Sequence, residues 1–289
     1  MAKNKRSGFM TTFDQLQKGI RKNARSNDIN SYLRSLTRDA ISYLANNASI
    51  VDLTSKVTGK EYFSYSIDGT KSRAVNKLLY RDMEMAEIFL ELLQSDEIRG
   101  NISSDDITSA CYTITMSLAC YIDITNKGDR QTPGTFFEYL ITYMLTKHFK
   151  SDPSTRVRVD IGDDKVSLTM DLILSVDDDK TKYHIAVKNS TRERASEIWA
   201  HQRILDKAFG DNTYTGLFIG LCETKLDHKI NEVTEICVPD QWRAYQQFLS
   251  ALHTIYYVDV PRAYKNLNQK PPYIVVKQIG DFYYDVPQE

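Results

Sequence analysis

The stretch from residue 167 to residue 190 constrains the fold more than any other part of the sequence. Apolar side chains occupy every second position over 168–176, and those of 183–187 alternate in the same way. A period of two is typical of a β-strand. The short linker between the two arms is rich in aspartate, which favours a turn. The pattern therefore predicts an antiparallel hairpin with one apolar and one polar face.

An aspartate and a lysine share the polar face of this hairpin. If Val176 pairs with Tyr183 across the turn, Asp171 lies opposite Lys188. A register slip of two residues would keep these side chains neighbours, whereas a slip of one would bury the polar face. The pair is either a cross-strand ion pair, worth about 0.2–1 kcal/mol, or the centre of a phosphodiesterase site. In such a site the carboxylate holds Mg²⁺ and the lysine stabilises charge or positions water.

The order of these residues resembles the motif of the PD-(D/E)XK nucleases, and of type II restriction endonucleases in particular. That motif has an Asp late in one strand, a hairpin, the pattern x-x-Lys in the next strand, and then a helix. Here it reads Met170-Asp171, Ala186-Val187-Lys188 and a helix from about Arg192. The resemblance covers roughly residues 131–224. Two positions depart from it, because Met170 replaces a proline and Ala186 replaces an acidic residue that would bind metal.

The resemblance implies an α/β fold of mixed α+β type, with a restriction-endonuclease-like core whose mixed sheet has five or more strands flanked by helices. It also implies a Mg²⁺-dependent enzyme that cleaves double-stranded DNA at specific sequences as a homodimer. Asp171, Glu138 and Val187 are then assigned to the metal, and Lys188 stabilises charge. Since Ala186 lacks an acid, a catalytically silent DNA-binding protein on the same fold remains an alternative, as do a repair or RNA-directed nuclease and an unrelated α/β protein.

Two polar residues on largely apolar helices are candidates for supporting roles. Glu138 lies on a helix predicted over about 135–149 that is apolar nearly all round, so its charge needs a partner or a function. Solvent and Arg130 are the alternative partners. Gln202 interrupts the apolar stripe of the next helix, either as a buried amide or, as the resemblance implies, as a group that reaches the catalytic lysine or a metal-bound water. Glu197 lies about 140° from Gln202 around that helix and is predicted to face solvent, although a helix carboxylate replaces the missing acid in some restriction enzymes.

Basic residues beside the hairpin and near the N-terminus are candidates for contact with DNA. Positive charge together with helix N-terminal amides suits phosphate binding. A solvated basic face and a frayed terminus are the alternatives. The residues assigned to DNA contact are Asn189, Ser190, Arg192, Arg194, Lys22 and Arg25.

Composition sets only broad limits on function. The chain has 289 residues, with 37 basic and 38 acidic side chains, so its total charge argues neither for nor against nucleic acid. Its four cysteines form no C-x-x-C pair, which argues against a zinc ribbon and suits a reducing cytoplasm. No run of about 18 uninterrupted apolar residues occurs, so no membrane span is expected. We expect a mainly helical region over 1–130, for DNA recognition or dimerisation, and a catalytic core with a C-terminal extension over 131–289.

Periodicity predicts the remaining elements. The strand over 216–223 is expected to be parallel to the second arm of the hairpin after a helical crossover. Asp160, on the strand before the hairpin, is a reserve metal ligand, whereas His184 and His201 are more readily structural than general bases. The further helices are expected over about 27–47, 72–94, 104–122, 192–210 and 239–253, a loop or short hairpin over 50–71, and the further strands over 156–161, 230–238, 254–260 and 273–276.

Overall fold

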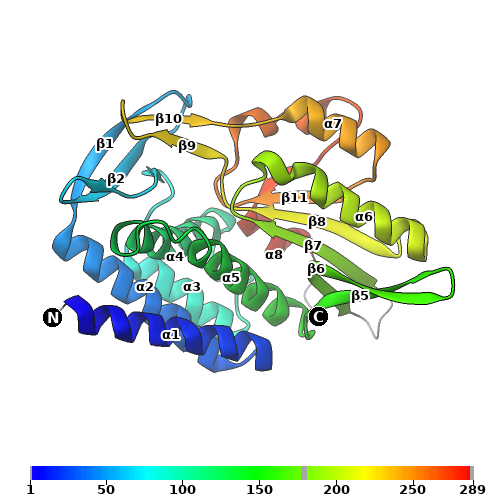
Figure 1. The fold of residues 1–289 in the computed structure, drawn as a ribbon, viewed down its shortest axis with the longest axis horizontal. Helices are drawn as coiled ribbons and strands as arrows, with labels where there is room; N and C mark the ends of the chain where they lie inside the picture. The colour runs from blue at the N-terminus through cyan, green and yellow to red at the C-terminus, as the bar shows by residue number, and fades with distance from the viewer. Residues whose placement is uncertain (1, 177–180, 287–289) are drawn as a thin grey trace.

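The computed structural model describes residues 2–176 and 181–286, so the expected turn at residues 177–180 lies outside the described range. Two six-stranded sheets are present in that range, with helices packed against them (Figure 1). We call them the hairpin sheet, of order β12-β11-β8-β7-β6-β5, and the second sheet, of order β3-β2-β1-β10-β9 with β4 paired to β2.

The hairpin sheet is mixed. In chain order, the strands β5, β6 and β7 form an antiparallel meander, and β8, β11 and β12 run parallel to β7. The predicted parallel crossover from β7 to β8 is therefore confirmed, as is the predicted fold class. The strands are β5 (Ser154–Ile161), β6 (Asp164–Val176), β7 (Thr181–Lys188), β8 (Tyr214–Gly220), β11 (Thr254–Tyr257) and β12 (Val276–Gln278).

Helices cover both faces of this sheet (Figure 1). On one face, α5 (Thr132–Phe149) packs against apolar side chains of β6 and β7. On the other, α6 (Ala195–Phe209) and α7 (Pro239–Phe248) pack through Trp199 and Trp242 onto β7, β8 and β11. The face of the hairpin that was predicted to be polar is covered by α6 over most of β7. Ala186 and His184, which lie on this face, are buried.

The remaining helices form a bundle around α4. Helices α2, α3 and α5 pack against α4, whose apolar side chains supply much of the main core. By length and composition α4 could cross a membrane, but 89% of its most apolar window is buried inside the protein, as expected of a core helix. The bounds are α1 (Ala2–Lys22), α2 (Asn27–Asn47), α3 (Met83–Ser95), α4 (Ser104–Thr125) and α8 (Phe282–Asp285), with short 3-10 turns η1 (Arg192–Arg194), η2 (Arg262–Tyr264), η3 (Leu267–Gln269) and η4 (Ile279–Asp281).

The second sheet joins distant parts of the chain. Strand β10 pairs in parallel with β1, so that Thr54 lies beside Glu232. Both β9 and β10 follow the hairpin in sequence, and the sheet therefore contains residues from both sides of position 130. Its strands are β1 (Ser49–Ser55), β2 (Tyr62–Ile67), β3 (Thr70–Lys71), β4 (Val75–Asn76), β9 (Thr224–Asp227) and β10 (Glu232–Glu235).

A buried ion cluster ties the second sheet to the hairpin sheet. Lys60 Nζ donates to Glu235 Oε1 at 2.7 Å and to Asp259 Oδ1 at 2.5 Å. Its third hydrogen bond is to the Val260 carbonyl. Asp259 is 2% exposed, and it follows β11 closely in sequence. Because a lysine has three donors, these contacts satisfy the buried ammonium completely.

Three local predictions are wrong. The helix expected over 72–94 begins only at Met83, because the preceding residues form β4 and a loop in which Asn76 Oδ1 accepts from the Leu78 amide. The basic N-terminal segment, for which a frayed terminus was one alternative, instead forms the helix α1. The helix expected over 239–253 ends at Phe248.

Candidate active site

Asp171 and Lys188 meet at the end of β7. Lys188 Nζ lies 2.9 Å from Asp171 Oδ1 and 2.8 Å from Oδ2. The Val187 amide also donates to Asp171 Oδ2, at 3.0 Å. Both side chains are partly buried, with 22% of Asp171 and 11% of Lys188 exposed, so the pair is fixed yet open to a ligand on one side.

The register that produces this contact differs from the expected one by two residues. Val176 pairs with Thr181 and not with Tyr183. Regular pairing ends at Leu172 with Ile185, and beyond it the Asp171 carboxylate bonds to the backbone of β7. Lys188 therefore lies beyond the last residue pair between β6 and β7, and its side chain reaches back to Asp171. Asp171 and Lys188 are therefore neighbours, as expected for a register slip of two residues. The prediction that they lie directly opposite each other is wrong.

Two further carboxylates, from the flanking helices, lie near enough to this pair to interact with it electrostatically. Glu138, on α5, is accessible to solvent, yet desolvation by the surrounding protein raises its pKa, and the negative charge of Asp171 raises it further. Lys188 and Arg194 act in the opposite direction. Glu197 Oε1, on α6, lies 3.7 Å from Lys188 Nζ. The prediction that Glu197 faces only solvent is therefore wrong, because the end of β7 lies beside the first turn of α6.

The donor set suits a hard divalent cation. Among the residues that the structure describes, no group of three His, Cys, Asp or Glu side chains is arranged to hold a metal ion. Mg²⁺ commonly binds one or two protein carboxylates and completes its shell with water and substrate phosphate oxygens. Asp171 and Glu138 supply two carboxylates, and Asp171 Oδ1, which accepts from Lys188, keeps a second lone pair for a metal ion. These residues therefore fit Mg²⁺.

Gln202 is a structural amide in this fold. It is 1% exposed, and its Nε2 donates to Asp206 Oδ1 and to the Tyr214 carbonyl, both at 2.9 Å. Its Oε1 lies 3.0 Å from His184 Nδ1. These contacts use both amide hydrogens, and none of them involves Lys188. Gln202 is thus the buried amide with satisfied hydrogen bonds that was one of the two alternatives. The expected contact between Gln202 and Lys188 is absent.

A buried glutamate holds the loop that follows Lys188. Glu223 Oε1 accepts from the backbone amide and hydroxyl of Thr191, both at 2.7 Å, and from the Tyr257 hydroxyl at 2.8 Å. Burial raises the pKa of Glu223. The loop also contains Arg192, whose φ of 26° is in the left-handed region that few non-glycine residues adopt. Sequence reasoning missed Glu223, since a glutamate after a buried strand carries no periodic signal.

The predicted DNA contacts separate into two groups. Asn189, Ser190 and Arg192 line one groove next to Lys188, and Arg194 is exposed near Glu138. Arg25 instead lies beyond the far end of α5, where it pairs with Asp152 and donates to the Lys150 carbonyl. Lys150 lies twelve positions after Glu138, at the C-terminal end of α5, which is about 18 Å at the rise of an α-helix. Lys22 ends α1 on that far side, so Lys22 and Arg25 are remote from the Asp171–Lys188 pair.

Asp160, the reserve metal ligand, is also remote. It pairs with Lys165 on β6, six residues before Asp171, which is about 20 Å along a strand. The side chain of His184, on β7, is buried against α6, and burial lowers its pKa to about 4. These positions leave Asp171, Lys188, Glu138 and Glu197 as the group that the fold brings together.

This arrangement defines the class of fold. A mixed sheet, a meander that carries an Asp–Lys pair and helices on both faces form a type II restriction endonuclease-like fold, which is a DNA endonuclease fold. The chain is similar to the crystal structure of the Type IIP restriction endonuclease Kpn2I, with 28% identity, a TM-score of 0.81 and coverage of 96% of this chain and 95% of that chain. The restriction endonuclease PspGI in its substrate DNA complex has 16% identity and a TM-score of 0.45, with coverage of 70% and 90%. No protein-family model and no curated protein matches the sequence.

Proposed function

We propose that the protein is a Mg²⁺-dependent endonuclease that cleaves double-stranded DNA at specific sequences. The observation that carries the proposal is the contact of Lys188 Nζ with both carboxylate oxygens of Asp171, at a partly open strand end flanked by α5 and α6. The similarity to Kpn2I over 96% of the chain supports the same assignment.

Each residue has a defined role in the proposed reaction. Asp171 and Glu138, with the Val187 carbonyl, would hold Mg²⁺, which when bound supplies a Lewis acid beside the scissile phosphate. Lys188 donates to a non-bridging phosphate oxygen and stabilises the charge that develops there. Its contact with Asp171 fixes the ammonium before DNA arrives, so little side-chain freedom is lost on binding.

Glu197 is the proposed substitute for the acid that is missing at Ala186. Its carboxylate lies beside the same ammonium as that of Asp171. It can therefore accept a hydrogen bond from Lys188 or from an attacking water, and keep the lysine oriented toward the phosphate. This role requires no direct contact between Glu197 and Asp171.

We further infer that the enzyme works as a homodimer. Duplex recognition sites with two-fold symmetry match a protein assembly of the same symmetry. Analytical ultracentrifugation with and without DNA tests this inference, and a single protein copy on each cleaved duplex would contradict it.

The activity is tested by incubating the purified protein with plasmid and phage DNA in Mg²⁺ or in EDTA. Discrete fragments in Mg²⁺ alone are expected, and sequencing of their ends gives the recognition site. Asp171→Asn and Lys188→Met should abolish cleavage, while Lys207→Met, on the exposed end of α6, should not. Full cleavage by Asp171→Asn would refute the proposal. Salt-sensitive DNA binding without cleavage in any divalent metal would instead favour the catalytically silent binding protein.

A further inference from the structure

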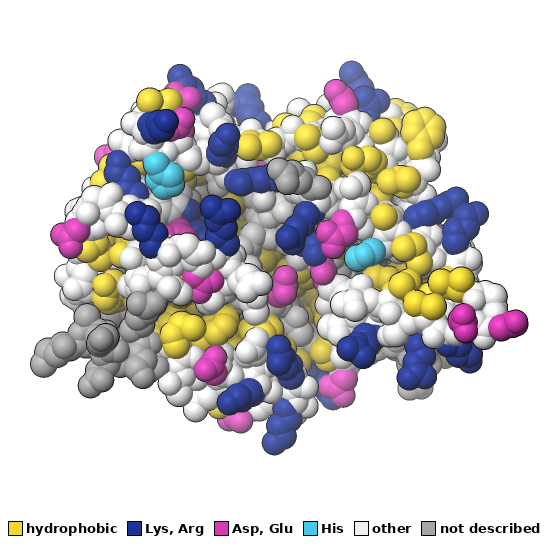
Figure 2. All heavy atoms as spheres, in the orientation of Figure 1, with side chains coloured by type: hydrophobic (Ala, Val, Ile, Leu, Met, Phe, Trp, Pro, Cys, Tyr) yellow, Lys and Arg dark blue, Asp and Glu magenta, His cyan; other side chains and the backbone are white. Residues whose placement is uncertain are grey.

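A groove of about 960 Å³ opens next to Lys188, between the second sheet and the hairpin sheet. One wall comes from β3 and the loop after it, and another from β9. The end of α4 with its following loop, and the loop after β7, complete the lining. Figure 2 shows basic side chains around the recess between the two halves of the molecule.

Charge in the groove is strongly biased. Six basic side chains line it, against two carboxylates, although the whole chain has a net charge of −1. Positive charge is therefore concentrated here and compensated elsewhere. The six basic residues are Lys71, Arg73, Lys127, Arg130, Arg192 and Lys225.

Both carboxylates of the groove are already engaged. Asp123 receives two hydrogen bonds from the Arg73 guanidinium, at 2.8 and 2.9 Å. Asp129 accepts from the amide and hydroxyl of Thr132, at 3.0 and 2.7 Å, and from Asn126 at 2.9 Å. These hydrogen bonds lower the pKa of Asp129 despite its partial desolvation. The carboxylate fixes the loop, and among the described residues it forms no ion pair with the basic side chains of the groove.

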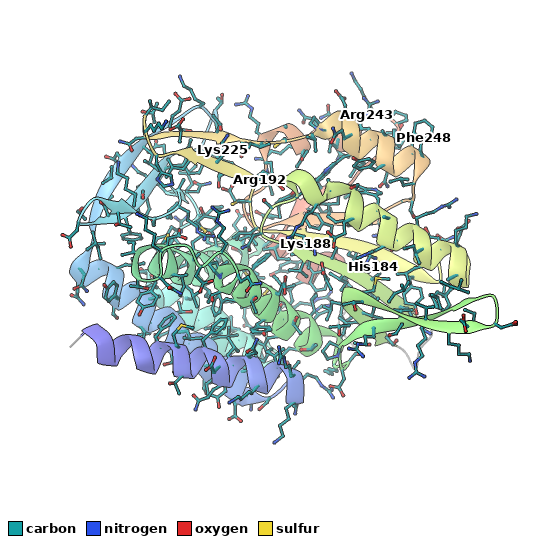
Figure 3. The ribbon with its side chains drawn as sticks, in the orientation of Figure 1. His184, Lys188, Arg192, Lys225, Arg243 and Phe248 are labelled. Carbon is teal, nitrogen blue, oxygen red and sulfur yellow. The ribbon has the colours of Figure 1, made fainter. Side chains whose placement is uncertain are left out.

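Three basic side chains remain available to a ligand. Lys127, Arg130 and Lys225 are exposed, and within residues 2–176 and 181–286 none of them has an ion-pair partner. The Arg192 guanidinium donates to the Thr224 carbonyl at 2.8 Å, and among the described residues it has no ion-pair partner. Figure 3 shows Lys225, Arg192 and Lys188 following one another from β9 to the end of β7. The line of positive charge thus leads from the second sheet to the active-site lysine.

The floor of the groove also has an unused polar atom. Asn189 Oδ1 is buried and has no hydrogen-bond partner among the described residues. Asn189 directly follows Lys188 and lines the groove. A buried carbonyl oxygen without a donor costs about 1–3 kcal/mol; because this oxygen is an acceptor, a water and not a phosphate oxygen would complete it.

We propose that this groove holds the DNA backbone next to the scissile phosphate, and that the second sheet supplies one of its walls. The proposal rests on the proposed function and assigns the second sheet to DNA binding, a role distinct from dimerisation. An open groove lined by uncompensated lysine and arginine suits a polyanion, since each phosphate contact releases counterions. Arg25, by contrast, is paired with Asp152 beyond the far end of α5, away from this groove.

The test measures DNA affinity separately from cleavage. Fluorescence anisotropy with a labelled duplex of about thirty base pairs, in EDTA, gives the binding constant at several salt concentrations. Lys127→Ala and Lys225→Ala should weaken binding and should each reduce the slope of log K against log salt by roughly 0.9, the value for one lost phosphate contact. Lys207→Ala and Lys265→Ala, exposed lysines outside the groove, are the matched controls and should leave both quantities unchanged.

The outcomes separate this proposal from the proposed function. If the groove variants bind as the controls do, the groove proposal is overturned, whether or not the wild-type protein cuts DNA. If the wild-type protein binds but does not cut, and the groove variants lose affinity, the groove is upheld and the nuclease assignment fails. Because all four lysines are exposed, unchanged thermal unfolding is expected and serves as the control for folding.

Discussion

Acid should destabilise this protein through one buried histidine. His184 is fully buried in β7, and burial lowers its pKa from 6.5 to about 4, with the charge of His201 adding to the effect. Gln202, Asp171 and Asp206 act in the opposite direction but do not compensate. In the unfolded chain the ring takes up a proton near pH 6.5, whereas in the folded chain it stays neutral until pH 4. The contribution of neutral His184 to the free energy of unfolding is therefore fully present above about pH 6.5 and is lost as the pH falls toward 4.

The shift sets the size of this effect. From the two pKa values, the His184 contribution to the free energy of unfolding falls by about 2 kcal/mol at pH 5 and by about 3 kcal/mol at pH 4. Carboxylates also titrate in this range, so the comparison must be made with a variant that lacks the ring.

Urea unfolding from pH 7.5 to pH 4.5 provides the assay. His184→Asn should lower stability at pH 7.5, because the contact with Gln202 changes, but its stability should fall less steeply with acid than that of the wild type. His201→Asn, which removes a partly exposed histidine from α6, should follow the wild-type slope. Parallel pH profiles for the wild type and His184→Asn would refute the reasoning, as would an NMR titration that places the His184 pKa near 6.5.

Three further predictions concern other buried or partly buried carboxylates and their partners. Glu197→Gln should reduce cleavage by roughly 10- to 100-fold without weakening DNA binding, as expected for a group that acts through its neighbour; single-turnover rates would show this, and an unchanged rate would remove Glu197 from the site. Glu223→Ala should cost about 1–3 kcal/mol in urea unfolding, because Thr191 loses its acceptor, and Glu223→Gln should restore most of the loss. Lys60→Met should cost roughly 3–5 kcal/mol, because the Asp259 carboxylate is left buried without its cation; a loss below 1 kcal/mol would contradict the ion cluster.

The hairpin was predictable because its signal is local. Alternation over 168–176 and 183–187 is enough to predict β6 and β7, and the pairing of two strands brings Asp171 near Lys188 at either of two registers. The helices around residues 27–47 and 104–122 carry equally local signals and form as expected.

Positions that depend on distant segments could not be obtained in this way. The predicted angle between Glu197 and Gln202 around α6 follows from helix geometry alone. It could not show that the end of β7, with Lys188, lies beside the first turn of α6, where Glu197 is. The apolar residues near Leu78 fit a helical period, yet Leu78 is 53% exposed, since the backbone there is fixed by Asn76. Pairing of β10 with β1 joins residues 54 and 232, and no local pattern encodes such a contact.

That long-range pairing has a consequence for the order in which the molecule is completed during synthesis. The hairpin with Asp171 and Lys188 leaves the ribosome before β9 and β10, and Asp259, which anchors Lys60, follows later still. Closure of such distant contacts is slow compared with formation of local elements. A nascent chain therefore carries the Asp171–Lys188 pair for some time before β9 completes the wall of the groove. The groove is therefore completed only after β9, β10 and Asp259 have been synthesised.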